Sequence, residues 1–200
     1  MIVVLGRPLA AGDPSGGLAA AGLGVRIAIA CAALGASVEL AGTVGDDSAG
    51  GALAVALARH GVGHAALLRI ASVATPRAGD ADRLPGLEAP EIDLALRYLP
   101  ECRVLVIAEP LSAEAERAAI EAAAYHGAAV VGLVADSADG ADGAATRGLA
   151  AAVTMLLLPL EPGSPFAELV ARYAVGLDAG QSAAAAFDAA RRAVGWEPVS

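Results

Sequence analysis

The chain has 200 residues, of which 56% are hydrophobic and 18% are charged, and its net charge at pH 7 is −9. This length and composition predict one domain, residues 1–200, with a substantial core, and exclude an intrinsically disordered protein. The acidic balance and the absence of Lys and of any basic run argue against nucleic acid as a partner, because phosphate backbones are bound by clustered basic side chains.

The amino-acid sequence shows neither a membrane-spanning stretch nor a secretion signal. The longest apolar stretches, 27–36 and 149–160, fall short of the roughly 20 residues that a spanning helix needs, so we predict buried segments and no membrane partner. The first residues, MIVVLG, lack the basic region of a secretion signal and resemble a first strand. A cytoplasmic protein is therefore expected.

Short apolar runs alternate along the chain with Ala-rich segments of helical length. Strands are predicted at 2–5, 38–41, 65–70, 104–108, 129–134 and 153–158. Helices are predicted at 24–34, 49–60, 91–98, 113–126, 144–150, 165–177 and 182–194. This alternation is typical of an α/β protein whose mainly parallel sheet is flanked by helices.

Several residues have local structural interpretations. Ser112 and Asp47 each precede an Ala-rich run and are predicted N-caps, and Gly127 is predicted to end the helix that begins at 113. Cys31 and Cys102 lie in apolar surroundings without metal-ligand spacing, so both are expected to be free, buried thiols.

The segment GLGVRIAIACAALGASVELAGTVGDDSAGGALAVALARHGV, residues 22–62, has a distinctive order of turn, helix, strand, acidic turn and helix. It resembles the N-terminal half of the ribokinase-like sugar kinases, the PfkB carbohydrate kinase family. CRVLVIAEPLSAEAERAAIEAAAYHGAAVVGL and VGLDAGQSAAAAFDAARRAV look like later passages of the same family. The resemblance implies a ribokinase-like, Rossmann-like three-layer sandwich, shortened here by about a third, and a reaction that uses ATP and magnesium.

The resemblance also implies where a sugar or nucleoside would bind. The family's Gly-Gly turn corresponds to Gly22 and Gly24, and its Asn position is occupied by Arg26, which has donors but no acceptor. Arg26 either grips an anionic group such as a phosphate or carboxylate, or pairs with Asp46 or Asp47 to close the turn.

Asp13 lies between the first strand and the first helix, where family members place an acid near the sugar, although its Pro-Ser-Gly context is equally typical of a plain turn. The candidate substrate-binding residues are therefore Asp13, Gly22, Gly24, Arg26 and Asp46. Asp46 counts only through the family resemblance, because the adjacent N-cap pattern favours a structural turn.

The family's catalytic loop, a GAGD-type sequence, corresponds here to Gly163-Ser164-Pro165-Phe166. If Phe166 aligns with the aromatic residue after the family's Asp, the base position falls on Ser164, whose hydroxyl cannot accept a proton near neutral pH without a neighbouring base. Of the element that helps place magnesium, only Glu161 remains. We therefore predict no catalytic residue, no metal ligand and no retained ATP or magnesium.

Three functions remain open. The first is a non-catalytic family member that binds a small ligand (a sugar, nucleoside or anionic metabolite) or a partner protein in the old substrate cleft. The second is an active kinase with a divergent base, for which Asp46, Asp47 and Glu161 are the available carboxylates. The third is a structural homodimerising domain without a ligand. The resemblance also implies a small β lid, mapped to about 65–76, through which a homodimer is expected.

Overall fold

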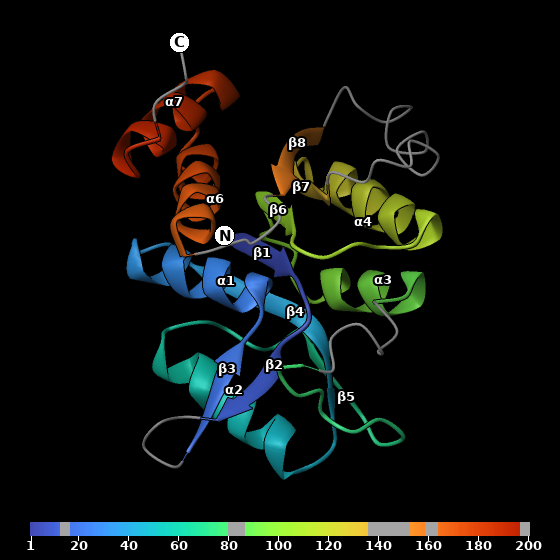
Figure 1. Ribbon diagram of the computed structural model, residues 1–200. Coiled ribbons are helices and arrows are strands. Elements are labelled where there is room, and N and C mark those ends of the chain that lie inside the picture. Colours follow the sequence, from blue (N-terminus) through green and yellow to red (C-terminus); the bar gives the residue numbers. More distant parts are fainter. Residues whose placement is uncertain (13–16, 80–86, 136–152, 159–163, 197–200) are drawn as a thin grey trace.

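The computed structural model describes residues 1–12, 17–79, 87–135, 153–158 and 164–196 (Figure 1). Its strands are β1 (Ile2–Leu5), β2 (Leu9–Gly12), β3 (Leu18–Ala21), β4 (Val38–Gly45), β5 (Leu67–Ile70), β6 (Val104–Ile107), β7 (Ala129–Ala135) and β8 (Val153–Leu158). Its helices are α1 (Leu23–Ala33), α2 (Ser48–Arg59), α3 (Ala89–Arg97), α4 (Ala113–His126), α6 (Ser164–Asp178) and α7 (Ala183–Ala193).

The main sheet is parallel and has six strands in the order β5-β4-β1-β6-β7-β8. In its centre, Ile2 of β1 pairs with Val38 of β4 on one side and with Val104 of β6 on the other. The prediction of an α/β protein with a mainly parallel sheet is confirmed. Strands 2–5 and 153–158 and helix 113–126 have the predicted ends.

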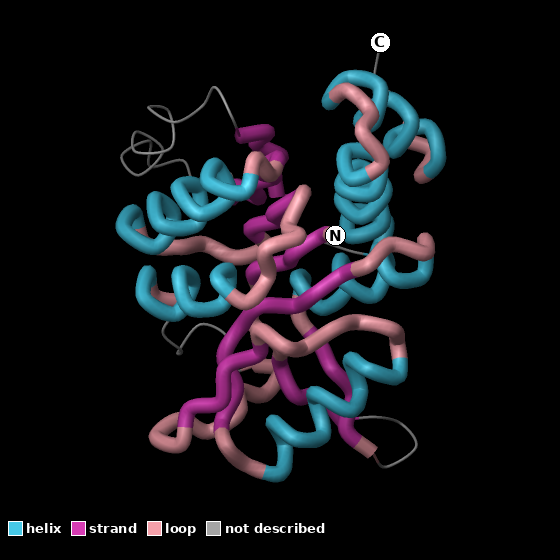
Figure 2. The backbone as a smooth tube through the Cα atoms, turned by 180° about the vertical axis from the view of Figure 1, so that it is seen from behind, coloured by secondary structure: helices cyan, strands magenta, loops and turns pink. Residues whose placement is uncertain are grey.

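Helices cover both faces of the sheet, which gives three layers (Figures 1 and 2). Alternate residues of β1 point to opposite layers: Ile2 and Val4 pack with α1 and α6, whereas Val3 and Leu5 pack with α3 and α4. All four β1 residues are fully buried, as expected for a central parallel strand that is covered on both faces.

The local predictions for the helix ends and the thiols are confirmed. Ser112 accepts a hydrogen bond from the backbone N–H of Ala115 at the start of α4, and Gly127 ends that helix with a left-handed conformation, φ 65°. Cys31 and Cys102 are free and buried, and burial raises their pKa values to about 12 and about 11. Neither thiol is therefore a ready nucleophile.

The antiparallel pair β2–β3 was not predicted from the sequence. Its four residue pairs run from Leu9–Ala21 to Gly12–Leu18, and it forms a separate two-stranded sheet that packs on α2. Ala10 also bonds to the segment after β5, since its N–H donates to the carbonyl of Pro76 at 2.7 Å. Within the segment 65–76, where a lid is expected, β5 pairs with β4 at the edge of the main sheet, and the lid stays a prediction.

Some predictions lie outside the described residues. These are the helix at 144–150 and the candidate residues Asp13, Glu161 and Gly163. No helix in the described part of the chain combines the length and apolar character needed to cross a membrane.

Candidate functional site

The order of the strands reverses its direction at one point of the main sheet. From β1 the chain moves outward through β4 to β5, and then crosses to β6 on the other side of β1. The carboxyl ends of β1 and β6 therefore flank the point where the direction of winding reverses. In open parallel sheets, ligands bind outside the carboxyl ends of the strands at such a point.

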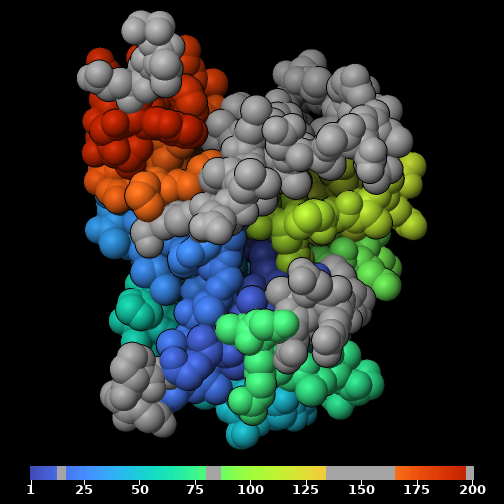
Figure 3. Space-filling view, in the orientation of Figure 1, coloured from blue at the N-terminus to red at the C-terminus, as the bar shows by residue number. Residues whose placement is uncertain are grey.

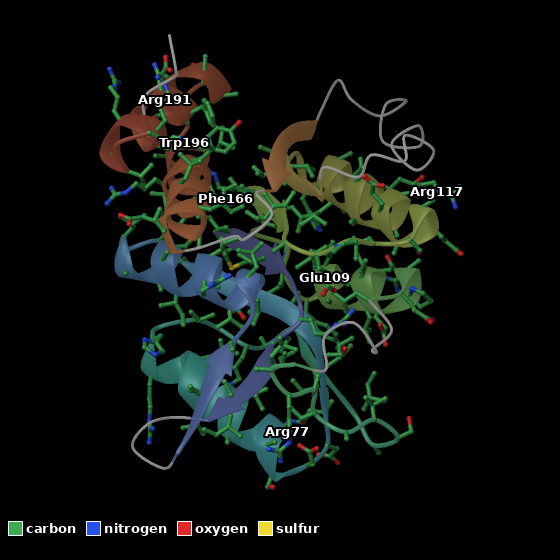
Figure 4. All side chains as sticks on the ribbon, viewed as in Figure 1. Arg77, Glu109, Arg117, Phe166, Arg191 and Trp196 are labelled. Atoms are coloured by element: carbon green, nitrogen blue, oxygen red, sulfur yellow. The ribbon has the colours of Figure 1, made fainter. Side chains whose placement is uncertain are left out.

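Two charged side chains follow these strands directly. Arg7 comes two residues after the end of β1 and Glu109 two residues after the end of β6. Arg7 Nε lies 3.6 Å from Glu109 Oε2, and only 16% and 11% of the two side chains are exposed. In the labelled view, Glu109 lies in the interior of the molecule, close to α3 (Figure 4).

One carboxylate oxygen of Glu109 is a buried, unsatisfied hydrogen-bond acceptor. Its Oε1 atom is buried and accepts no hydrogen bond from the described residues. Burial raises the pKa of Glu109 above the usual value of a glutamate, and the charge of Arg7, followed by the backbone N–H groups of Leu87 and Arg7, opposes that shift. A buried acceptor without a donor costs about 1–3 kcal/mol, which a ligand hydroxyl would recover.

Glycines bring the start of α1 against the end of β1. A Cβ added to Gly24 would lie 3.0 Å from Gly6 Cα, and one added to Gly22 would lie 2.7 Å from the carbonyl oxygen of Arg7. Gly22 also has φ 109°, a conformation that side chains other than glycine rarely adopt. The predicted Gly22–Gly24 turn thus lies beside Arg7.

The N-cap residue of α1 offers no capping side chain. Gly22 is its N-cap and makes no side-chain hydrogen bond, and the first turn contains no acidic residue. The first backbone N–H groups of a helix have no intrahelical acceptor, so they can donate to an oxygen of a ligand. Next to Glu109, the site therefore offers both donors and an acceptor.

Arg26 lies on another side of α1. It is exposed and lines a hollow of about 500 Å³ between α1 and α6, together with Ala167, Glu168 and Arg172. The structure therefore brings together Gly22 and Gly24 from the predicted site and places Arg26 on the wall of this hollow.

The acidic turn after β4 has a structural arrangement. Asp47 Oδ1 accepts hydrogen bonds from the Gly50 N–H at 2.8 Å and the Thr75 hydroxyl at 2.6 Å, and Oδ2 accepts from the Thr75 N–H at 2.9 Å. These bonds lower the pKa of Asp47 to about 2, with the Thr75 hydroxyl as the largest cause. Asp47 is the N-cap of α2, as predicted, and Asp46 lies 3.8 Å from Arg69.

The end of the chain contributes α6, which begins at Ser164 and has no acidic residue in its first turn. Phe166 and Leu169 are buried and pack in the layer that α6 forms with α1 (Figure 4). Within the described residues, no three His, Cys, Asp or Glu side chains come together as metal ligands.

Comparison with known proteins gives a match of structure without a match of sequence. No family model and no curated protein matches the amino-acid sequence. The PfkB protein of Polaromonas sp. JS666 superposes with a TM-score of 0.66 at 16% identity, over 98% of this chain and 96% of that one. The tetrameric inhibited form of Escherichia coli phosphofructokinase-2 gives 0.64 at 14% identity, over 96% and 92% of the two chains.

A third solved structure, Arabidopsis thaliana ribokinase complexed with ribose and ATP, gives a TM-score of 0.61 at 13% identity, over 96% of this chain and 90% of that one. This chain has the ribokinase-like fold. The three-layer arrangement expected from the sequence resemblance is therefore correct.

Arg7 and Glu109 were missed in the sequence, although a signal for them exists. In the ribokinase-like fold the buried strands 2–5 and 104–107 are central and parallel, and each is followed at the second position by a charged residue. Charged residues immediately after fully buried parallel strands lie at the edge of the sheet where ligands bind. The motifs that carry the family resemblance assign no role to Arg7 or Glu109, so the resemblance alone does not indicate this pair.

Proposed function

We propose that this chain is a non-catalytic member of the ribokinase-like PfkB kinases that binds a small polyhydroxyl ligand, a sugar or a nucleoside, where β1 and β6 end. The unpaired Oε1 of Glu109 carries the proposal, because a buried carboxylate oxygen at the switch point needs a donor. A ligand hydroxyl can donate to Glu109 and accept from the uncapped N–H groups of α1.

The nature of this acceptor favours a hydroxyl-bearing ligand over a simple anion. The positive charge of Arg7 already faces the Glu109 carboxylate. A negatively charged ligand bound beside Arg7 would therefore be repelled by Glu109. An anionic metabolite at this site would need the Arg26 side chain to turn toward it from the hollow between α1 and α6. We therefore place neutral sugars and nucleosides first and their phosphates second.

Phosphoryl transfer is not part of the proposal. It requires a metal, a phosphate cradle and a base held together. The first turn of α6 offers no carboxylate, Asp47 is held by three hydrogen bonds with its pKa lowered to about 2, and the described residues gather no metal site. The residues that the structure describes do not supply a site for ATP and magnesium, so we derive no step through them.

Ligand-dependent thermal unfolding tests the proposal. A ligand present at a hundred times its Kd stabilises the folded state by about 2.7 kcal/mol, which for a domain of this size raises Tm by about 5–11 °C. We expect this shift from at least one sugar or nucleoside in a panel that also contains sugar phosphates and nucleotides. The shift should be lost in Glu109→Ala and retained in Glu114→Ala, which changes an exposed glutamate of α4.

Kinase assays with ATP, magnesium and the same panel complete the test, and we expect no turnover. Binding by none of the compounds, or equal binding by the Glu109→Ala variant, would refute the ligand site. Turnover that disappears in Asp46→Ala or Glu161→Ala would instead establish an active kinase with a divergent base.

A further inference from the structure

The outer surface of α3 and α4 concentrates large exposed hydrophobic side chains. The chain contains only six aromatic residues, three Tyr, two Phe and one Trp. Two of them are exposed at the carboxyl ends of these helices, Tyr98 over 68% and Tyr125 over 87% of the side chain, and Leu94 on α3 is 44% exposed. Of these three side chains, Tyr125 also lines a groove between the two helices, and a large exposed aromatic side chain beside an apolar groove is characteristic of protein–protein contacts.

A groove runs between the same two helices. Its volume is about 880 Å³, and its apolar lining comes from both helices and the turn after α3: Ala89, Pro90, Leu96, Pro100, Ala118 and Ala122. Tyr125 lies at one end, and Glu114 lies at the other, because the first turn of α4 is at the opposite end of the helix. The groove can therefore receive an aromatic side chain from a partner.

The charges along α4 indicate which partner fits. Glu114, Arg117, Glu121 and Tyr125 follow one another at intervals of three or four residues, so they form one stripe on the helix. Glu114, Arg117 and Glu121 are exposed and make no ion pair with another described residue. In the labelled view, Arg117 projects away from the body of the molecule (Figure 4).

The charges of this stripe are complementary to those of a second α4 that runs antiparallel to it. If two copies of α4 cross antiparallel about an axis near Ala119, Arg117 of each copy faces Glu121 of the other. The same arrangement brings the acidic start of one α4 toward the end of the other, where Arg97 and His126 border the groove. A face that pairs unlike charges with its own copy is what a two-fold interface requires.

We propose that the α3–α4 face is the interface of a homodimer, in which α4 packs antiparallel on α4 of a second copy and Tyr125 enters the partner's groove. This interface differs from the one expected at 65–76, which the structure places at the β5 edge of the main sheet. The space-filling view shows α3 and α4 side by side on the right of the molecule, away from α7 (Figure 3).

Sedimentation equilibrium of the full chain tests the proposal, and we expect a dimer at micromolar concentration. Tyr125→Ser removes the anchoring ring and should raise the dimer Kd by about 30-fold, the effect of losing an aromatic side chain that fills a partner's groove. Arg117→Glu and Glu121→Arg each place like charges opposite each other across the axis, and each should raise Kd by more than about tenfold. The double variant Arg117→Glu/Glu121→Arg restores both pairs and should dimerise again.

The matched control is Arg192→Glu, which reverses an exposed charge on α7 and should leave the dimer unchanged. Circular dichroism confirms that each variant is folded, since every substituted side chain is exposed. A monomeric wild type would overturn the proposal. So would a dimer that persists in both single charge reversals, or one that the double swap fails to restore.

Discussion

Thr75 is predicted to hold the end of β4, the start of α2 and the segment after β5 together. It is 6% exposed, and its hydroxyl accepts a hydrogen bond from the Gly45 N–H at 3.0 Å while it donates to Asp47 Oδ1. Thr75→Val keeps the shape of the side chain but leaves the Gly45 N–H without its acceptor. A buried donor that loses its partner costs about 1–3 kcal/mol.

For a domain of this length, a loss of about 2 kcal/mol lowers Tm by about 4–8 °C, which calorimetry and urea unfolding can measure. Thr43→Val is the matched control, because Thr43 of β4 is half-buried and its hydroxyl makes no hydrogen bond in the structure. Its stability should change by no more than about 0.5 kcal/mol. Equal unfolding temperatures for wild type and Thr75→Val would refute the assigned role.

Three further predictions concern single residues. The pKa of Asp47, lowered to about 2, means that its stabilisation is present above the ordinary value of 3.8 and is lost as the pH falls toward 2, so Asp47→Asn should flatten the acid dependence of the urea midpoint. Burial raises the pKa of Glu109, so the contribution of this side chain to the free energy of unfolding is present at low pH and is lost as the pH rises through the raised pKa. Glu109→Gln should remove this loss of stability with rising pH, which urea unfolding at a series of pH values measures. A Cβ on Gly63 would lie 2.0 Å from Glu39 Oε1, so Gly63→Ala should lower Tm in wild type and have a smaller effect in Glu39→Ala, where that carboxylate is absent.

Strands and helices of the main sheet and its two covering layers could be predicted because they are marked by residues that are close together in the sequence. The β1 strand is an apolar run too short for a helix, and α4 is marked by its cap at Ser112 and its glycine at 127. The family resemblance added the three-layer arrangement. These features are specified by residues adjacent in the chain, which a single sequence reveals.

The β2–β3 hairpin could not be predicted in the same way. Its strands, LAAG and LAAA, lack the β-branched and aromatic residues that mark strands, and Ala favours helix. The hairpin is stabilised by contacts made elsewhere: Ala10 packs with Val44 and Leu53, and its backbone pairs with the segment after β5. Tertiary packing therefore outweighs local preference.

The candidate site was predicted in part for a related reason. Gly22 and Gly24 were found through the resemblance, and the structure places them beside Arg7. The pairing of Arg7 with Glu109 joins residues that are far apart in the chain and become neighbours only because β6 lies next to β1. Such a pair appears once the order of the strands is known.

The proposed function requires a binding site that persists while the loop before α6 diverges, and the fold is compatible with both. The proposed binding residues follow β1 and β6, whose positions are fixed by a sheet core that is buried on both faces. The transferring group would come from the first turn of α6, whereas this helix is anchored to α1 further along, through Leu169, Val170 and Tyr173, all of them at most 1% exposed. The core contacts described for α6 are made by residues from Phe166 onward, so selection for folding alone does not preserve an acid at the start of this helix.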